Sequence, residues 1–141
     1  MFKIKIFSIG KTKEPWLQEA TEEYHKRIKN SILIEWILCK NDEQLISALE
    51  KESSWICLDP LGSLMTSEEF ATSLFSRLEK EGSRLNLVIG GAEGLPKNLR
   101  EKSKGLISLS KMTFTHQITR LILLEQIYRA LEIRKGSGYH K

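Results

Sequence analysis

The sequence predicts an α/β fold with a mainly parallel sheet and helices on both faces. Three observations support this class. Short apolar runs alternate with segments of helical period along the whole chain. The predicted strand 53–59 is short, and its apolar residues, 55–58, follow one another without a break, as in strands buried on both faces. Hydrophobic residues make up 40% of the chain, and no repeat or linker interrupts the 141 residues, so we expect one domain over residues 1–141.

The first half predicts two strands and two helices in turn. Residues 2–10 begin by alternating apolar and lysine side chains, which is typical of a strand. Pro15 suits the first position of a helix whose apolar stripe continues to Ile28. Residues 31–40 favour a second strand, and Asn41 with the acidic residues after it indicates the start of a short helix.

The second half continues the alternation. The third strand, 53–59, is expected to end where Pro60 and Gly62 follow. Thr66 and Glu69 form a capping-box pattern that opens a third helix, which Gly82 ends. The remaining elements are two strands, a short helix between them and a long final helix, and they are expected in the segments RLNLVIGG, LPKNLREKSK, GLISLS and THQITRLILLEQIYRALEIRKG.

The final helix is apolar on more than one face. Its apolar residues are Ile118, Leu121, Ile122, Leu124, Ile127, Tyr128 and Leu131. A helix that covers a sheet from one side needs only one apolar stripe. We therefore expect part of it to face a second surface, and a homodimer is the simplest source of that surface.

Composition excludes several classes of protein. No apolar run approaches the roughly 18–20 residues that span a bilayer, and the N-terminus has no signal-peptide pattern. Cys39 and Cys57 lie in apolar runs with no metal-binding spacing, so we expect two buried free thiols, no metal site and a cytoplasmic location.

Charge is concentrated toward the C-terminus. Residues 97–141 carry ten Lys or Arg and three Asp or Glu, a net of +7, whereas residues 1–96 have a net of −3. A basic segment of this kind is typical of contact with a polyanion, although a solvated surface would look the same.

The stretch LVIGGAEGLP, residues 87–96, is a strand that ends in a glycine turn. It lacks the G-x-G-x-x-G spacing of a dinucleotide site, and the chain has no phosphate-binding P-loop motif. A glycine turn at the carboxyl end of a parallel strand nevertheless lies at the ligand edge of an open α/β sheet. An oxidoreductase is therefore disfavoured, and either a ligand-binding turn or a plain tight turn fits.

Three segments together resemble a known family. VIGGAEGL, SLSKMTFTHQITRLILLEQIYRA and the terminal YHK are similar to the RlmH family of SPOUT-class methyltransferases, and the resemblance covers essentially the whole chain. That family methylates N3 of a pseudouridine in bacterial large-subunit (23S) ribosomal RNA with S-adenosylmethionine. The resemblance implies a C-terminal trefoil knot that binds the methyl donor, and a homodimer that acts on RNA within the ribosome.

The resemblance also implies particular residues. The donor contacts would be Leu58, Gly90, Leu109, Ser110, Lys111, Met112, Thr113 and Phe114. These positions lie at the C-terminal ends of three predicted strands, so the ligand-edge rule for open sheets points to the same place. Ala92 and Thr115 stand where the family often has proline, and Thr115 could cap the final helix instead.

Methylation of N3 requires the loss of its proton, so a base would help. His140 is the preferred candidate for this proton acceptor, and Glu93 and His116 are the alternatives. Tyr139 could stack on the nucleobase of the substrate. The cations expected to meet RNA phosphates are Arg120, Arg129, Arg134, Lys135 and Lys141, with Lys111 beside the donor. Arg120 and Arg129 would equally fit a role in supporting the dimer or the knot.

Two other functions compete with this prediction. A SPOUT enzyme that methylates transfer RNA would share the fold, but it would be expected to carry an additional RNA-binding domain. A non-enzymatic basic module that binds RNA or ribosomes would share the charge but would not bind S-adenosylmethionine.

Overall fold

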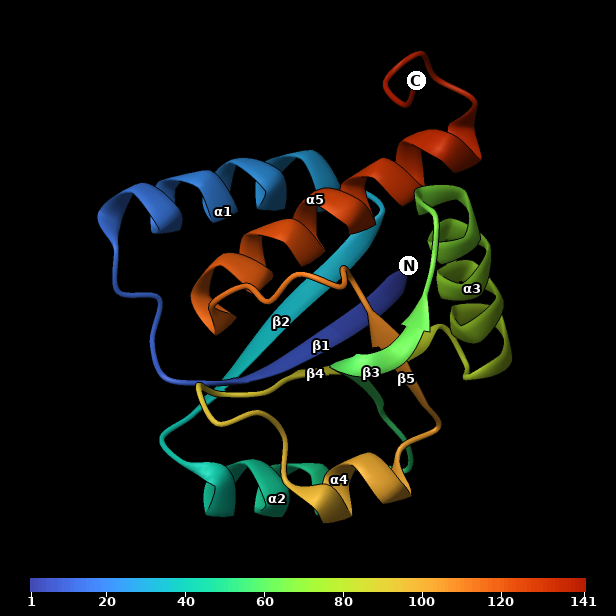
Figure 1. The fold of residues 1–141 in the computed structure, drawn as a ribbon. Coiled ribbons are helices and arrows are strands. Elements are labelled where there is room, and N and C mark those ends of the chain that lie inside the picture. Colours follow the sequence, from blue (N-terminus) through green and yellow to red (C-terminus); the bar gives the residue numbers. More distant parts are fainter.

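The computed structural model describes residues 1–141 as alternating strands and helices (Figure 1). The elements are β1 (Phe2–Ile9), α1 (Pro15–Ile28), β2 (Ile32–Cys39), α2 (Asp42–Glu50), β3 (Ile56–Leu64), α3 (Ser67–Lys80), β4 (Arg84–Ile89), α4 (Lys97–Lys102), β5 (Gly105–Ser108) and α5 (His116–Lys135). Each predicted strand and helix is present.

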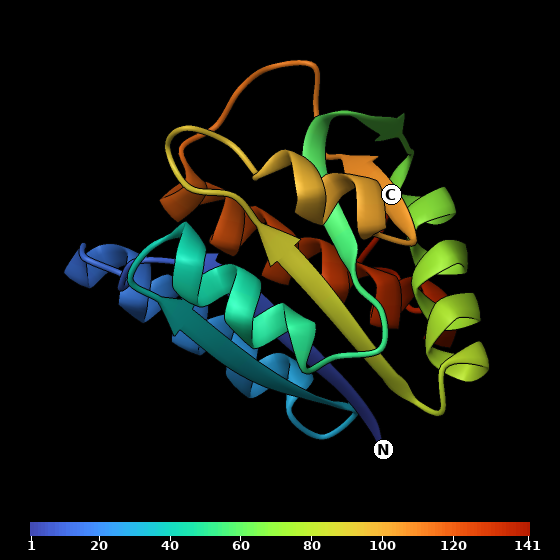
Figure 2. The same cartoon turned by 90° about the horizontal axis from the view of Figure 1, so that it is seen from below.

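All neighbouring strands pair in parallel, in the order β2-β1-β4-β3-β5. Helices α1, α3 and α5 cover one face of the sheet, and α2 and α4 cover the other (Figures 1 and 2). The predicted fold class is therefore confirmed. Because every strand runs the same way, the loops that follow the strands gather at one edge.

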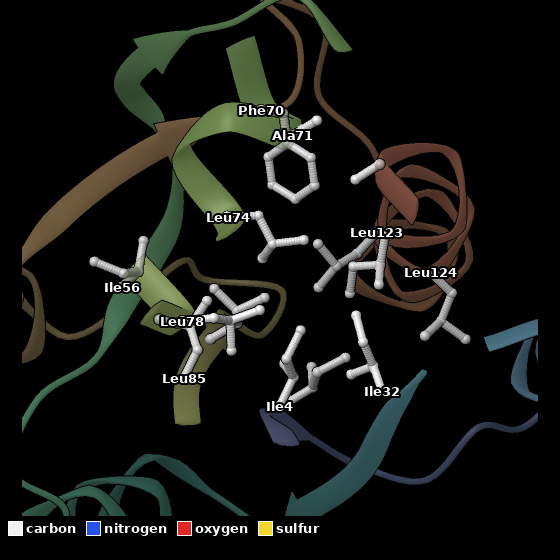
Figure 3. Close-up of a cluster of buried hydrophobic side chains, with 14 of the residues drawn as sticks. Ile4, Ile32, Ile56, Phe70, Ala71, Leu74, Leu78, Leu85, Leu123 and Leu124 are labelled. Atoms are coloured by element: carbon white, nitrogen blue, oxygen red, sulfur yellow. The ribbon is translucent and has the colours of Figure 1, made fainter. Parts of the chain in front are cut away.

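The larger core lies between the sheet and the three helices of the first face. Figure 3 shows side chains from α3 and α5, among them Leu74, Leu78 and Leu123, converging on Ile4 and Ile56 of the sheet. Burying each such side chain contributes about 1.5–3 kcal/mol. A smaller core under α2 and α4 contains both cysteines, which are free and buried as predicted.

The helix ends follow the predicted capping chemistry. The Asn41 side chain accepts a hydrogen bond from Gln44 N. Thr66 and Glu69 form the complete capping box at the start of α3. No helix is both long and apolar enough to cross a membrane.

Strand β3 differs from its prediction, because it continues through Pro60 and Gly62 instead of ending before them. Its pairing with β5 shifts register between Leu58 and Ser63, so the strand bends rather than stops. A Cβ at Gly62 would lie 2.5 Å from the carbonyl carbon of Leu106. Glycine at position 62 lets the backbones of β3 and β5 approach closely, whereas the sequence pattern suggested only a strand breaker.

The buried face of α5 also differs in part from the prediction. Leu123 and Ala130 are fully packed in the core, although neither was in the predicted set. Ile118 is 40% exposed, and Leu121 and Ile122 are only half-buried. The sheet and the flanking helices α1 and α3 thus cover one broad side of α5 and leave several apolar side chains uncovered.

Candidate functional site

A cavity of about 740 Å³ opens at the carboxyl edge of the sheet, between the bend of β3, the ends of β4 and β5, and the starts of α1 and α5. The loops after β4 and β5 project beyond the same end of the sheet (Figure 2). Seven of the eight predicted donor residues line the cavity: Leu58, Gly90, Leu109, Ser110, Met112, Thr113 and Phe114. The eighth, Lys111, is exposed and outside the lining.

The glycine turn after β4 forms one wall of the cavity. Gly91 and Gly94 form an antiparallel bridge, and Gly94 adopts φ +83°, a conformation that favours glycine. A Cβ at Gly90 would lie 2.8 Å from the carbonyl carbon of Gly94 and 3.0 Å from Leu95. The turn therefore requires glycine at position 90 for its own closure, before any ligand is considered.

The loop between β5 and α5 forms the opposite wall. Ser108 Oγ donates to Ser110 O at 2.9 Å, and Met112 N donates to Ser110 Oγ at 2.9 Å. Thr115 then caps α5 by accepting from Ile118 N at 3.2 Å, as predicted for the residue in place of the family's proline. These bonds fix the shape of the loop along this wall of the cavity.

Asp59 lines the cavity at the bend of β3, and its functional potential was missed by sequence reasoning. Its carboxylate is almost buried; Oδ1 accepts from Leu61 N at 2.8 Å, and Oδ2 lies 4.0 Å from Arg100 Nε. A carboxylate directly after a buried strand and before a proline was the signal that could have indicated it.

Arg120 does not lie where the predicted RNA contact would place it. Its side chain is fully buried, and the guanidinium donates to Ser8 Oγ, Thr12 Oγ1 and the carbonyl oxygens of Ile9 and Gly10 at 2.7–3.1 Å. No surface of Arg120 is left for a phosphate. The residue instead joins α5 to the end of β1, which is the structural role that a buried, fully bonded cation can play.

The first turn of α5 contributes two further polar side chains to the cavity. Gln117 Nε2 donates to Lys11 O at 2.8 Å, which ties the turn to the β1–α1 loop. His116 lines the cavity, and burial, followed by the charges of Arg120 and Lys13, lowers its pKa. Its imidazole is therefore unprotonated at neutral pH and can accept a proton. Glu93 is exposed and lies outside the lining.

The C-terminal tail lies away from the cavity, at the other end of α5 (Figure 1). Tyr139 donates its hydroxyl to Glu125 Oε2 at 2.8 Å and meets the ring of Tyr128 edge-on. His140 contacts Glu68 Oε1 at 2.7 Å and Arg129 Nη1 at 3.0 Å. The tail thus folds back along α5 as far as Glu125, the tenth of its 20 residues. Neither Tyr139 nor His140 belongs to the lining of the cavity of its own chain.

The remaining predicted RNA contacts cluster near the tail. Arg129 pairs with Glu125 at 3.1 Å and stacks on Tyr139. Arg134 packs on the ring of Phe75 and lies 3.5 Å from a carboxylate oxygen of Glu79. The two lysines of the set, Lys135 and Lys141, are exposed and make no ion pair.

Sequence comparison assigns the class of protein that this fold and cavity represent. A family model described as a predicted SPOUT methyltransferase matches residues 2–140, so the chain belongs to the SPOUT methyltransferase family. It is thus a methyltransferase by family, which argues against both the non-enzymatic module and the oxidoreductase.

Within this family, the chain resembles ribosomal RNA large subunit methyltransferase H. The protein of that name from Protochlamydia amoebophila (strain UWE25) is 59% identical over 141 residues, covering 100% of both chains. The one from Coprothermobacter proteolyticus (strain ATCC 35245 / DSM 5265 / OCM 4 / BT) is 41% identical over 139 residues, covering 99% of both. A crystal structure of a probable methyltransferase from Bordetella pertussis Tohama I shares the fold, with a TM-score of 0.56 at 11% identity over 92% of this chain and 95% of that one.

Proposed function

We propose that this chain transfers a methyl group from S-adenosylmethionine to N3 of a pseudouridine in large-subunit ribosomal RNA, in the cytoplasm and on the assembled ribosome. The observation that carries the proposal is the cavity at the carboxyl edge of the sheet, whose walls contain seven residues expected to contact the donor. The full-length identity to proteins named large-subunit RNA methyltransferases supports the choice of substrate.

The cavity suits a ligand of the donor's size and chemistry. Small-molecule sites usually enclose about 300–1,000 Å³, and 740 Å³ lies in this range. Leu58, Ile89 and Leu109 would supply apolar contacts to an adenine ring, with backbone groups of the Gly90 turn at its polar edge. The Asp59 carboxylate would suit the hydroxyls or the positive charge of the ligand. When bound, S-adenosylmethionine supplies an electrophilic methyl group, and the protein has to align the nucleophile with it.

The substrate side of the reaction is proposed to require two copies of the chain. Tyr139 and His140 dock against Glu125, Arg129 and Glu68, outside the lining of the cavity of their own chain. A homodimer that presents the tail of one chain to the cavity of the other would complete the site. The apolar side chains of α5 that remain exposed, with Ile118 at its first turn, support such a contact.

His116 becomes a stronger candidate base in this arrangement than the sequence suggested. It is the one candidate among Glu93, His116 and His140 that lines the cavity of its own chain. Its lowered pKa leaves the imidazole free to take the N3 proton near neutral pH. His140 of the partner subunit would then hold or orient the nucleobase of the substrate, with the partner subunit's Tyr139 beside it.

The proposed function is tested by calorimetry and methyl transfer. The purified chain should bind S-adenosylmethionine and methylate ribosomal large subunits prepared from a strain that lacks it, with the new methyl group mapped to one pseudouridine. Bulk transfer RNA and free ribosomal RNA are the comparison substrates. Preferential methylation of transfer RNA would replace the proposed substrate, and no donor binding at millimolar concentration would contradict the proposal.

The shared site is tested by mixing two inactive variants. One variant carries Gly90→Val, which blocks the glycine turn, and the other ends at Gly138, which removes Tyr139, His140 and Lys141. If the partner supplies the tail, mixed dimers should recover up to about a quarter to a half of the activity, depending on how completely subunits exchange. Lack of recovery despite demonstrated mixed dimers would mean that tail and cavity act in the same chain.

A further inference from the structure

We propose that the loop between β1 and α1, residues 10–14, binds the phosphate backbone of the substrate RNA through Lys11 and Lys13. This inference rests on the proposed function and adds to it an RNA-binding element that neither the basic C-terminal segment nor the terminal YHK indicated. Three observations support it: the position of the loop, the bonds that hold it, and the state of its charges.

The loop lies at the cavity. Its last residue, Glu14, and Trp16 in the first turn of α1 belong to the lining. Lys11 O accepts from Gln117 Nε2 at 2.8 Å, and Gln117 itself lines the cavity. Lys13 is near enough to His116 for its charge to lower the pKa of that imidazole. A nucleotide that enters the cavity would therefore bring its own or its neighbour's phosphate close to the loop.

The loop is held in a defined shape by Arg120. The guanidinium bonds Ser8 Oγ, Thr12 Oγ1 and the carbonyl oxygens of Ile9 and Gly10, so it contacts the chain on both sides of the bend. Gly10 adopts φ +80°, which turns the chain at the end of β1. Arg120 is thus a positioning residue: its own charge is buried, and it fixes the backbone from which Lys11 and Lys13 project.

The two lysines are free to bind an anion. Both are exposed, and neither makes an ion pair. Lys111, on the loop that forms the facing wall, is exposed and unpaired as well. Glu14 is an exposed carboxylate on the same loop. In contrast, Arg129 and Arg134 near the tail already pair with carboxylates. A lysine without an ion pair can bind a phosphate without first losing a carboxylate partner, whereas Arg129 and Arg134 would have to give up theirs.

The test compares two double variants that lose the same charge. Lys11→Ala/Lys13→Ala removes the proposed contacts. The control, Lys51→Ala/Lys102→Ala, removes two exposed lysines that make no ion pair. Lys51 follows α2 and Lys102 ends α4. Because β3 and β5 begin just after these positions, both lysines lie at the edge of the sheet opposite the cavity. The readouts are KM and kcat with ribosomal large subunits, the Kd for S-adenosylmethionine, and the dependence of RNA affinity on salt.

The loop variant should raise KM roughly tenfold and lower the salt slope by about two, with kcat and donor affinity within about twofold of wild type. The control should match wild type. If both variants change KM equally, or if the loop variant matches wild type, the inference is wrong and the proposed function stands. If wild type itself methylates no ribosomal RNA, both the proposed function and this inference fail.

Discussion

The two ends of α5 are held in different ways. At its start, Arg120 is fully buried and bonds neutral hydroxyls and carbonyls of the β1 end. Beyond its end, the tail is held by half-exposed aromatic and ionic contacts, of which His140 with Glu68 is typical; the Glu68 side chain is 62% exposed. Buried, fully satisfied networks are rigid, whereas exposed pairs contribute little and are screened by salt.

This difference indicates that the start of α5 supports a rigid site and that the segment after its end is free to move. The cavity at the start of α5 is preorganised, as a site that must align a methyl group has to be. The tail can leave its docked position at small cost, which the proposed contact with a second copy of the chain would require. Four predictions test this contrast, in decreasing order of expected effect.

Arg120→Ala should be the most damaging change. It removes five hydrogen-bond contacts, two buried and three partly buried, and takes a donor away from Ile9 O and Gly10 O. The free energy of unfolding should fall by about 3–5 kcal/mol, measured by urea denaturation. Arg84→Ala, at an exposed arginine without an ion pair, should stay within about 0.5 kcal/mol of wild type. A small loss for Arg120→Ala would show that the start of α5 is not rigidly held.

Gly90→Ala should cost about 1–3 kcal/mol of stability and weaken donor binding, because the added Cβ would lie 2.8 Å from backbone of Gly94. Gly91→Ala is the matched control, since its Cβ would meet Ile9 at an ordinary 3.5 Å. Denaturation and calorimetry with S-adenosylmethionine measure the two effects. Equal effects of the two substitutions would argue against a tightly closed turn.

Tyr139→Phe should loosen the tail by about 1 kcal/mol, because it removes the bond to Glu125 and keeps the ring. Trypsin cleavage after Lys135 should become faster, whereas Tyr128→Phe, which loses a bond within α5, should leave it unchanged. Burial and then the Glu125 bond raise the pKa of Tyr139 to about 12.

Because this pKa is raised, the bond stabilises docking fully below the unfolded value of about 10. Its contribution is lost as pH rises from about 10 toward about 12. An ultraviolet difference titration of wild type against Tyr139→Phe should show the Tyr139 midpoint in that window. A midpoint at the ordinary value would mean that the tail is undocked in solution.

The smallest expected effect concerns His116. Its lowered pKa means that the fold favours the neutral imidazole, so its contribution to stability is present above about 6.5 and is lost as pH falls below it. Titration followed by NMR should place the His116 midpoint below the ordinary value. Lys13→Gln should move the midpoint up, because it removes a nearby positive charge, and Lys51→Gln should not. An unchanged His116 midpoint in Lys13→Gln would show that the charge of Lys13 does not reach the cavity.

Local patterns predicted the elements of the fold well. The alternation in residues 2–10, Pro15, the Asn41 cap and the Thr66–Glu69 capping box each specify a strand or a helix end through contacts within a few residues. The resemblance of three segments also indicated residues that proved to share one cavity. Both kinds of prediction depend on neighbours in sequence or on motifs that are themselves short.

The predictions that were wrong concern contacts between distant residues. Gly62 was expected to break β3, but it serves the approach of β5, more than forty positions later. Arg120 was expected to meet RNA, but its partners at Ser8 and Gly10 are more than a hundred positions away. Asp59 and Lys13 gained functional interest only because the topology brought the bend of β3 and the β1–α1 loop to the cavity.

The sequence by itself determined the alternation of strands and helices, the helix caps, the basic C-terminal segment and the family. These features depend on periodicity, local hydrogen bonds and composition, all of which can be determined from the sequence without knowing the fold. Tertiary structure alone decided which cations are buried, paired or free, and that the docked tail stays outside the lining of the cavity of its own chain. Burial and ion pairing arise where distant segments meet, so their energies are set by packing and solvent exclusion rather than by any one stretch of residues.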